Sequence, residues 1–169
     1  MIRTDSLAVI ESIIATAPLT VRRMVRWGEC DPAGVVFTSR FSDYVISAAE
    51  LFYGSLFDTT PQRAKHEQGF GTPSRALSFD FIDSLRPDDV FDTVVTVESV
   101  NRRTFVLDIT GRKPDGGTIF VAKLTPVCVA RSERRSIDIP ADFRALLIDY
   151  QASCEQAGVR TDQNPKEQS

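Results

Sequence analysis

The chain has 169 residues, of which 42% are hydrophobic and 25% charged; this composition fits one ordinary globular domain and excludes collagen-like, disulfide-dense and wholly disordered chains. The net charge of −3 offers no basic surface to attract nucleic acid or an anionic membrane, so neither is an expected partner. One histidine and three cysteines without a CxxC pair argue against a zinc cluster, and the odd cysteine count favours a reducing compartment. We therefore expect a cytoplasmic protein with no metal and no cofactor.

The first 20 residues are expected to form an N-terminal extension with a short helix that ends before Pro18. Acidic residues at Asp5 and Glu11 interrupt the apolar stretch, which argues against a signal peptide or a membrane span. The side chains that share one face of this helix are all apolar: Leu7, Ile10, Ile13 and Ile14.

A strand is predicted over residues 21–27, with its interleaved arginines facing water, and a turn-rich loop follows over residues 28–34. Thr38 and Ser39 are good N-cap residues for a long helix that reaches about Leu56. Its apolar residues recur at helical spacing over an arc wider than a surface stripe, so we expect a central helix buried on most sides by a curved sheet.

The apolar period changes to two after residue 76, and four strands are expected in a meander up to Ala130. Residues 114–117 have the composition of a hairpin turn. A second helix is predicted from Pro140 to about Ala157, with Gly158 as its stop. We therefore expect one domain over residues 21–158, and a disordered polar tail over residues 159–169.

Together these elements predict an α+β fold in which a curved antiparallel sheet wraps around one long central helix, the layout called hotdog. Within this pattern, the string WGECDPAGVV at Trp27–Val36 resembles the signature of the 4-hydroxybenzoyl-CoA thioesterase family of hotdog enzymes. The resemblance continues through Gly71–Pro73, Asn101–Phe105 and Ile137–Phe143, and covers roughly residues 21–147. It implies a homo-oligomer, with a tetramer built from dimers preferred, that hydrolyses acyl-CoA thioesters without a metal.

Thioester hydrolysis needs a base or nucleophile near the carbonyl carbon and donors where negative charge develops on the oxygen. Asp31 can supply the first, and the unpaired N–H groups at the start of the long helix, near Thr38, can supply the second. The resemblance assigns the same roles: Asp31 matches the catalytic carboxylate, and Thr38 stands where a backbone N–H polarises the thioester carbonyl. The family often has an aromatic residue at that second position.

The alternative for Asp31 is that it only stabilises the turn before Pro32, as an Asp-Pro pair commonly does. Glu29 is a rival carboxylate, which we expect to point away from Asp31 as a solvated charge or a local hydrogen-bond acceptor. Cys30, between them, is expected to pack rather than react.

Arg102 and Arg103 resemble the paired basic residues with which relatives hold the phosphates of coenzyme A, although adjacent arginines at a strand edge can equally be solvated. Gly71 and Thr72 are expected to allow close backbone approach near an acyl pocket, though a strand-entry turn would look the same. His66 is given no role.

The expected function is hydrolysis of an aryl-CoA, such as 4-hydroxybenzoyl-CoA, or of a short or medium acyl-CoA. The alternatives are a non-catalytic hotdog protein that binds acyl-CoA, and a dehydratase, which the lone histidine makes the weaker of the two. Relatives complete each site at a subunit interface, so the loop of Asp31 is expected to meet the Gly71–Thr72 segment of a partner copy.

Overall fold

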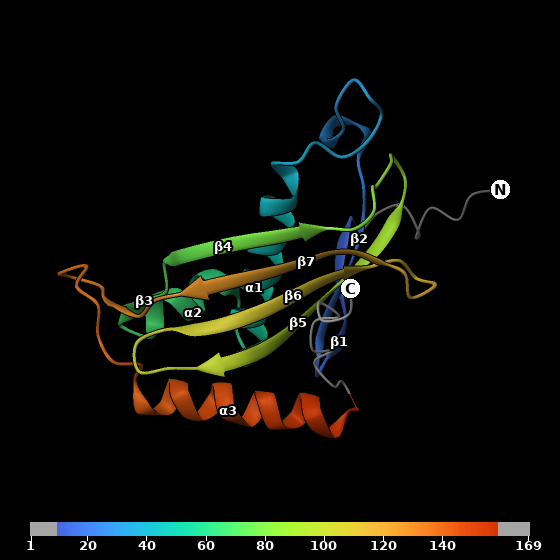
Figure 1. The fold of residues 1–169 in the computed structure, drawn as a ribbon. Coiled ribbons are helices and arrows are strands. Elements are labelled where there is room, and N and C mark those ends of the chain that lie inside the picture. The colour runs from blue at the N-terminus through green and yellow to red at the C-terminus, as the bar shows by residue number, and fades with distance from the viewer. Residues whose placement is uncertain (1–9, 159–169) are drawn as a thin grey trace, which may run out of the picture.

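A long helix, α1 (Arg40–Leu56), packs against one face of a six-stranded antiparallel sheet (Figure 1). The computed structural model describes residues 10–158. The strands of the sheet, in spatial order, are β1 (Glu11–Thr16), β2 (Leu19–Met24), β5 (Val90–Val100), β6 (Phe105–Arg112), β7 (Thr118–Pro126) and β4 (Ser74–Phe81). This is the hotdog architecture predicted from the sequence.

Shorter elements complete the fold. A helix, α2 (Pro61–Glu67), follows α1, and two short strands, β3 (Phe70–Gly71) and β8 (Val129–Ala130), pair with each other. The last helix, α3 (Ala141–Gln156), packs against β5 at the lower side of Figure 1. None of the helices among residues 10–158 is long and apolar enough to cross a membrane.

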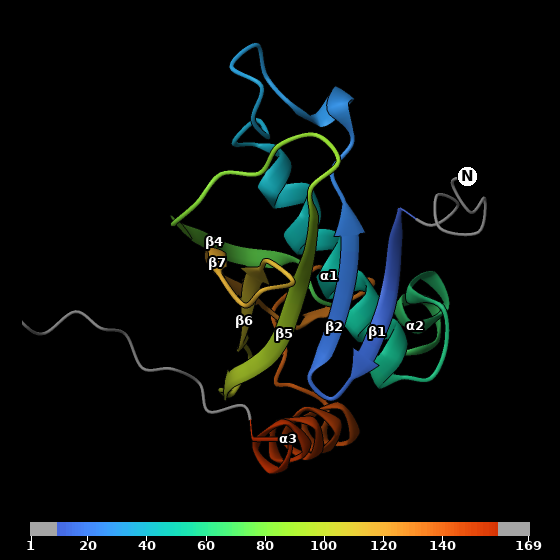
Figure 2. The same cartoon turned by 90° about the vertical axis from the view of Figure 1, so that its right-hand side faces the viewer.

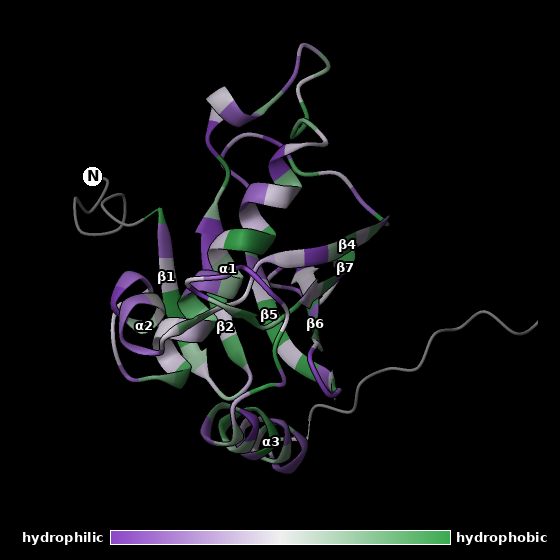
Figure 3. Cartoon of the chain, turned by 90° about the vertical axis from the view of Figure 1, so that its left-hand side faces the viewer, coloured by the Kyte–Doolittle hydropathy of each residue, from purple (hydrophilic) through white to green (hydrophobic). Residues whose placement is uncertain are grey.

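The core lies between α1 and the sheet and is rich in aromatic rings at both ends of the helix. Near its start, the ring of Phe41 meets those of Phe81 and Phe120 at centroid distances of 5.1 and 5.4 Å. Near its end, Phe105 contacts Tyr53 and Phe143. Figure 3 shows hydrophobic and hydrophilic segments alternating along α1, as expected for an amphipathic helix.

The predicted long helix and the C-terminal helix are confirmed, but α1 is not buried on most sides. Its outer stripe is exposed and carries Arg40, Asp43, Ile46 and Glu50. The C-terminal helix has Pro140 as its N-cap residue, and Gly158 follows with a φ of +82°. The hairpin turn over residues 114–117 is also present, closed by the N–H of Lys113 donating to Gly117 O.

The predicted N-terminal helix is wrong for the residues that the structure describes. Residues 11–16 form β1, which pairs with β2 in a hairpin and adds an edge strand to the sheet (Figure 2). The β-branched residues Ile13, Ile14 and Thr16 favour a strand, and an exposed edge can accept them without a full apolar face. Residues 1–9 and the tail over 159–169 lie outside the described part of the chain.

The expected four-strand meander is wrong in one connection. Strands β5, β6 and β7 do follow one another, but β4 pairs with β7 and not with β5. As a result β4 lies at the edge of the sheet, and most of its side chains are exposed. The strand expected over residues 21–27 ends at Met24, and His66, to which no role was given, lies in α2.

Candidate active site

The loop between β2 and α1 is a closed turn that carries Asp31. A 3₁₀ turn over Trp27–Glu29 leads into it, and Cys30 forms a β-bridge with Val36. Inside this bridge, the N–H of Asp31 donates to Val35 O, and the N–H of Gly34 donates to Asp31 O, both at 2.9 Å. Gly34 has a φ of +76°, a conformation that glycine adopts without strain.

The Asp31 carboxylate caps its own turn. Its Oδ1 accepts a hydrogen bond of 2.8 Å from the N–H of Ala33. Among the residues that the structure describes, no donor is assigned to Oδ2, and the residue is half-buried. The turn-stabilising role of the Asp-Pro pair is therefore present, and it leaves one carboxylate oxygen available for chemistry.

Thr38 is exposed in the turn that precedes α1, which begins at Arg40 with Ser39 as its N-cap residue. The carbonyl of Thr38 accepts from the N–H of Phe41, but no acceptor within residues 10–158 is assigned to the N–H groups of Thr38 and Ser39. Unpaired N–H groups at a helix start carry partial positive charge. The loop between β2 and α1 thus carries both a carboxylate oxygen without an assigned donor and, seven residues later, amide donors without an assigned acceptor.

Glu29 is only 6% exposed, so the expectation of a solvated charge is wrong and that of a local hydrogen-bond acceptor is confirmed. Its Oε1 accepts from Arg23 Nη2 at 2.8 Å and from Arg26 Nη2 at 3.2 Å. Its Oε2 accepts from the N–H of Arg26 at 2.8 Å and from the hydroxyl of Tyr44 at 3.2 Å. We call these four residues, Glu29, Arg23, Arg26 and Tyr44, the Glu29 cluster.

The electrostatics of the cluster keep Glu29 ionised. Burial acts to raise the pKa of Glu29, but the hydrogen bonds from the Arg26 N–H and from Arg23 outweigh it, and the pKa lies below its usual range. For Tyr44, burial and the neighbouring Glu29 charge raise the pKa. The guanidinium of Arg23 lies 4.7 Å from the centroid of the Tyr44 ring, so the cation is shared between the carboxylate and the ring.

The prediction that the arginines of β2 face water holds for Arg22, whose side chain is 45% exposed, and is wrong for Arg23, at 12%. The signal was in the alternation of the strand. Leu19 and Val21 point into the core, and a period of two places Arg23 on the same face. The carboxylates of Glu29 and Glu11 compensate its charge there.

Arg102 and Arg103 lie in the connection between β5 and β6, at the other end of the molecule. Their Nε atoms donate to the two carboxylate oxygens of Asp138, at 3.0 and 3.1 Å. Both side chains are exposed, at 75% and 48%. The two hydrogen bonds lower the pKa of Asp138, and the Nη1 of Arg103 also donates to the hydroxyl of Ser136 at 3.3 Å.

Gly71 and Thr72 belong to this second end. Gly71 pairs with Val129 in the short two-stranded sheet, and an added Cβ would meet the Val129 side chain at 3.3 Å, so the close approach expected of this glycine is made to the chain itself. The neighbouring Cys128 donates its N–H to the carbonyl of Arg103 at 2.8 Å. The candidate substrate-binding residues Gly71, Thr72, Arg102 and Arg103 are thus gathered in one place.

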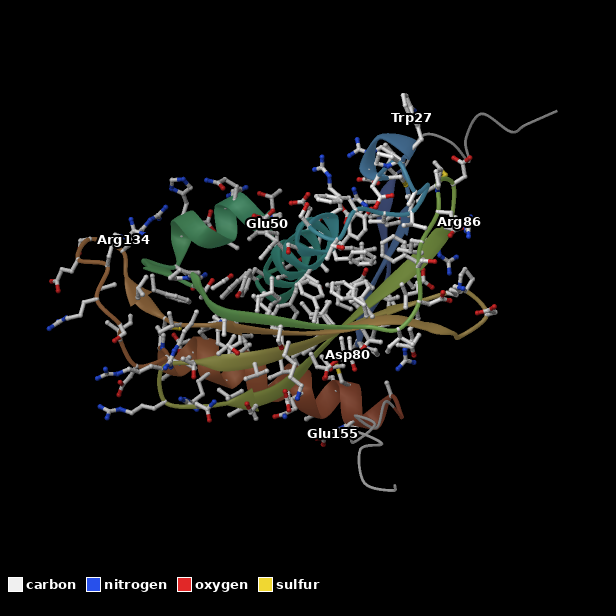
Figure 4. All side chains as sticks on the ribbon, turned by 45° about the horizontal axis from the view of Figure 1, so that its top comes forward. Trp27, Glu50, Asp80, Arg86, Arg134 and Glu155 are labelled. Carbon is white, nitrogen blue, oxygen red and sulfur yellow. The ribbon has the colours of Figure 1, made fainter. Side chains whose placement is uncertain are left out.

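The two groups of candidate residues are not brought together within one chain. Strand β4 separates them: it starts two residues after Thr72 and ends at Phe81, which contacts Phe41 in the first turn of α1. Eight residues of strand span roughly 25 Å. In Figure 4, Trp27, which belongs to the 3₁₀ turn before Asp31, and Arg134, which lies between β8 and α3, are at opposite ends of the molecule. Within residues 10–158, no three or more histidine, cysteine, aspartate or glutamate side chains lie together in a group that could hold a metal ion.

Comparisons with known proteins identify similar chains. A family model described as the thioesterase-like superfamily matches residues 25–147. The 4-hydroxybenzoyl-CoA thioesterase of Pseudomonas sp. (strain CBS-3) is 24% identical over 132 residues, which cover 74% of this chain and 94% of that protein. Its crystal structure superimposes with a TM-score of 0.65 at 25% identity, covering 75% of this chain and 96% of that one.

Two further solved structures share the fold. A 1,4-dihydroxy-2-naphthoyl-CoA thioesterase from Synechocystis has a TM-score of 0.67 at 23% identity and covers 77% of this chain and 95% of that one. A hypothetical protein from Staphylococcus aureus, solved in complex with CoA, has a TM-score of 0.73 at 15% identity and covers 93% of this chain and 99% of that one.

Proposed function

This chain belongs to the thioesterase-like superfamily, and from that premise we propose that it hydrolyses acyl-CoA thioesters with Asp31 as its catalytic carboxylate. The observation that carries the proposal is the loop between β2 and α1, which carries the Oδ2 of Asp31 and, seven residues later, the unpaired N–H of Thr38. A carboxylate beside amide donors is the minimal equipment for attack on a thioester carbonyl.

In the proposed reaction, the N–H of Thr38 donates to the thioester oxygen as negative charge develops there. Asp31 acts in one of two ways. It attacks the carbonyl carbon and displaces the CoA thiolate, forming an anhydride that water then cleaves, or it takes a proton from a water that attacks directly. A single turnover in ¹⁸O-water distinguishes direct attack by water from an anhydride that water cleaves at the Asp31 carbonyl. Direct attack places the label in the released acid, whereas cleavage of the anhydride at the Asp31 carbonyl places the label in Asp31 and releases unlabelled acid.

We propose that two copies complete the site by pairing through β4. This strand is a sheet edge with exposed side chains, and Phe81 and Ile82 at its end are 47% and 56% exposed. Antiparallel pairing of β4 with its copy would place the start of one strand, after Thr72, beside the end of the other, near Asp31. A homodimer is therefore the proposed minimal unit, and a dimer of dimers remains the preferred assembly.

The proposed substrate is an aryl-CoA or a short or medium acyl-CoA. Phe37 and Phe81 lie at the Asp31 end and are half-exposed, which supports an apolar acyl group there. The relatives whose names specify a substrate act on aryl esters, 4-hydroxybenzoyl-CoA and 1,4-dihydroxy-2-naphthoyl-CoA. The exposed arginines next to Asp138 are the proposed contacts of the CoA phosphates. The three free cysteines support a reducing, cytoplasmic location.

The direct test is release of free CoA from a panel of aryl and aliphatic acyl-CoA esters, read at several enzyme concentrations. We expect multiple turnovers with at least one ester, and a preference that identifies the acyl class. Saturable binding without release of CoA would instead assign the chain as an acyl-CoA-binding protein. Sedimentation of the active species as a monomer would contradict the shared site.

A further inference from the structure

A second carboxylate, two residues before Asp31, is buried where the loop begins. Glu29 accepts four hydrogen bonds from the other members of its cluster, which fill both of its oxygens. Glu29 therefore has no capacity to act as a second acid or base, and its contribution has to come through the loop.

Glu29 fixes both ends of that loop. Its side chain ties the loop to β2 through Arg23 and to α1 through Tyr44. Its backbone carbonyl accepts the N–H of Phe37 at 3.0 Å, and Phe37 directly precedes Thr38. One residue thus anchors the segment that carries the catalytic carboxylate and, through its main chain, the residue whose amide is to receive the oxyanion.

Fold stability alone does not account for this arrangement. Taking two charges out of water is costly, and a buried ion pair is often no more stabilising than apolar side chains of similar size. Both members of the central pair are well buried, with the side chains of Arg23 and Glu29 only 12% and 7% exposed. What the four hydrogen bonds to the Glu29 carboxylate do provide is direction, since each bond has a preferred geometry that an apolar contact lacks.

We infer that Glu29 is a positioning residue, which holds the Asp31 carboxylate and the Thr38 amide in the relative orientation that thioester cleavage requires. The inference rests on the proposed function. A misplacement of about 1 Å in an active site can cost roughly a hundredfold in rate, so modest loosening of this loop is enough to be measured.

The main test is Glu29→Gln, which keeps the size of the side chain and removes the charge that pairs with Arg23. We expect kcat to fall about tenfold or more while KM changes less than about threefold, because the substrate contacts are elsewhere. In an Asp31→Asn background, Glu29→Gln should lower kcat by less than about threefold, because the carboxylate that Glu29 positions is already gone. Amide hydrogen exchange should rise in residues 30–38 and stay unchanged in β5 and β6.

A matched pair of tyrosine variants separates positioning from stability. Tyr44→Phe removes the hydroxyl that donates to Glu29. Tyr150→Phe removes a part-buried hydroxyl on α3 that accepts from the N–H of Leu19 and donates to the carbonyl of Val95. Both should lower the melting temperature. Of the two tyrosine variants, only Tyr44→Phe should lower kcat, by about threefold or more. Glu29→Asp keeps the charge and should have a kcat between those of Glu29→Gln and the wild type, because its shorter side chain cannot reach all four donors.

The outcomes separate the two proposals. If the wild-type chain releases no CoA from any ester, the proposed function and this inference both fall. If the wild type turns over but Glu29→Gln and Tyr44→Phe keep full kcat, only the inference is overturned. Fully multiplicative losses from Glu29→Gln and Asp31→Asn would also overturn it. Should Glu29→Gln fail to fold, the two tyrosine variants decide the matter alone.

Discussion

The two ends of β4 treat charge in opposite ways. At the Asp31 end, Glu29 and Arg23 are buried and each is compensated by several partners. At the other end, Arg102 and Arg103 share Asp138 at the surface, where all three side chains are about half-exposed or more. Exposed ion pairs exchange partners easily, whereas buried ion pairs held by several hydrogen bonds do not.

This difference matches two kinds of task. In the proposed function, bond cleavage depends on fixed geometry, which we infer that the Glu29 cluster provides, while capture of a mobile, highly charged phosphate group depends on a field and on donors that can release a partner. Substitutions of the carboxylates and arginines at each end test this difference between the two ends.

The largest effect is expected for Asp31→Asn. The amide retains an oxygen to accept the N–H of Ala33 but cannot act as base or nucleophile, so kcat should fall about a hundredfold or more with little change in melting temperature. Asp115→Asn is the matched control, because the Oδ1 of Asp115 caps the β6–β7 turn in the same way, accepting from Gly117 N–H at 3.0 Å. Near-native turnover by Asp31→Asn would reject the mechanism.

The second effect is expected at the arginine end. Replacing Arg102 and Arg103 together by alanine should raise KM about tenfold for a CoA ester and leave a truncated thioester, without the nucleotide, almost unaffected. Arg22→Ala with Arg112→Ala removes the same charge near Asp92 and should leave both KM values unchanged. Equal effects of the Arg102 and Arg103 changes on the two substrates would show that these residues do not contact the phosphates.

Acid denaturation should sharpen the contrast. Because the pKa of Glu29 is lowered in the fold, its contribution to stability is present above the unfolded pKa and is lost as the pH falls through the lower, folded pKa. The melting temperature of the wild type should thus fall more steeply below about pH 4.5 than that of Glu29→Gln. The pKa of Asp138 is lowered too, but high salt should screen this exposed carboxylate and leave the Glu29 effect in place. Equal slopes for the wild type and Glu29→Gln would show that folding does not lower the pKa of Glu29.

The smallest effect is expected for Asp108, in the middle of β6. Burial raises the pKa of this carboxylate, with a hydrogen bond from Thr110 as partial compensation. A raised pKa means that its stability contribution is lost as the pH rises through the folded value. Asp108→Asn should therefore stabilise the fold at pH 7, by about 0.5 kcal/mol, in urea unfolding. Destabilisation would mean that Lys123 compensates the charge fully.

The sequence was most informative where its pattern was long and periodic. The apolar spacing of α1 and the loop string around Asp31 were sufficient to predict the central helix, the fold class and both candidate residues of the loop. The pattern failed for β1. Four apolar residues between positions 7 and 14 fit one face of a helix, but pairing with β2 makes residues 11–16 a strand. The position of β4 was also hidden, since strand partners are chosen by tertiary packing.

The site could be predicted only in part for a similar reason. Asp31 and Thr38 are close in sequence, so one local motif reports on both. For Glu29 the sequence left two alternatives, a solvated charge or a local hydrogen-bond acceptor, and the partners that decide for the second come in part from β2 and α1. That the arginines lie a strand's length from Asp31 follows from topology, which no local pattern contains.

The three cysteines have a practical consequence for oxidation chemistry. Burial raises the pKa of Cys128 to about 11, and burial is also the main cause of the raised pKa values of Cys30 and Cys154. Since only the thiolate attacks disulfides and peroxides, all three side chains should be sluggish toward oxidants near neutral pH. The native chain should consequently add almost no background when liberated CoA is titrated with an aromatic disulfide, and full colour from its own thiols should develop only after unfolding.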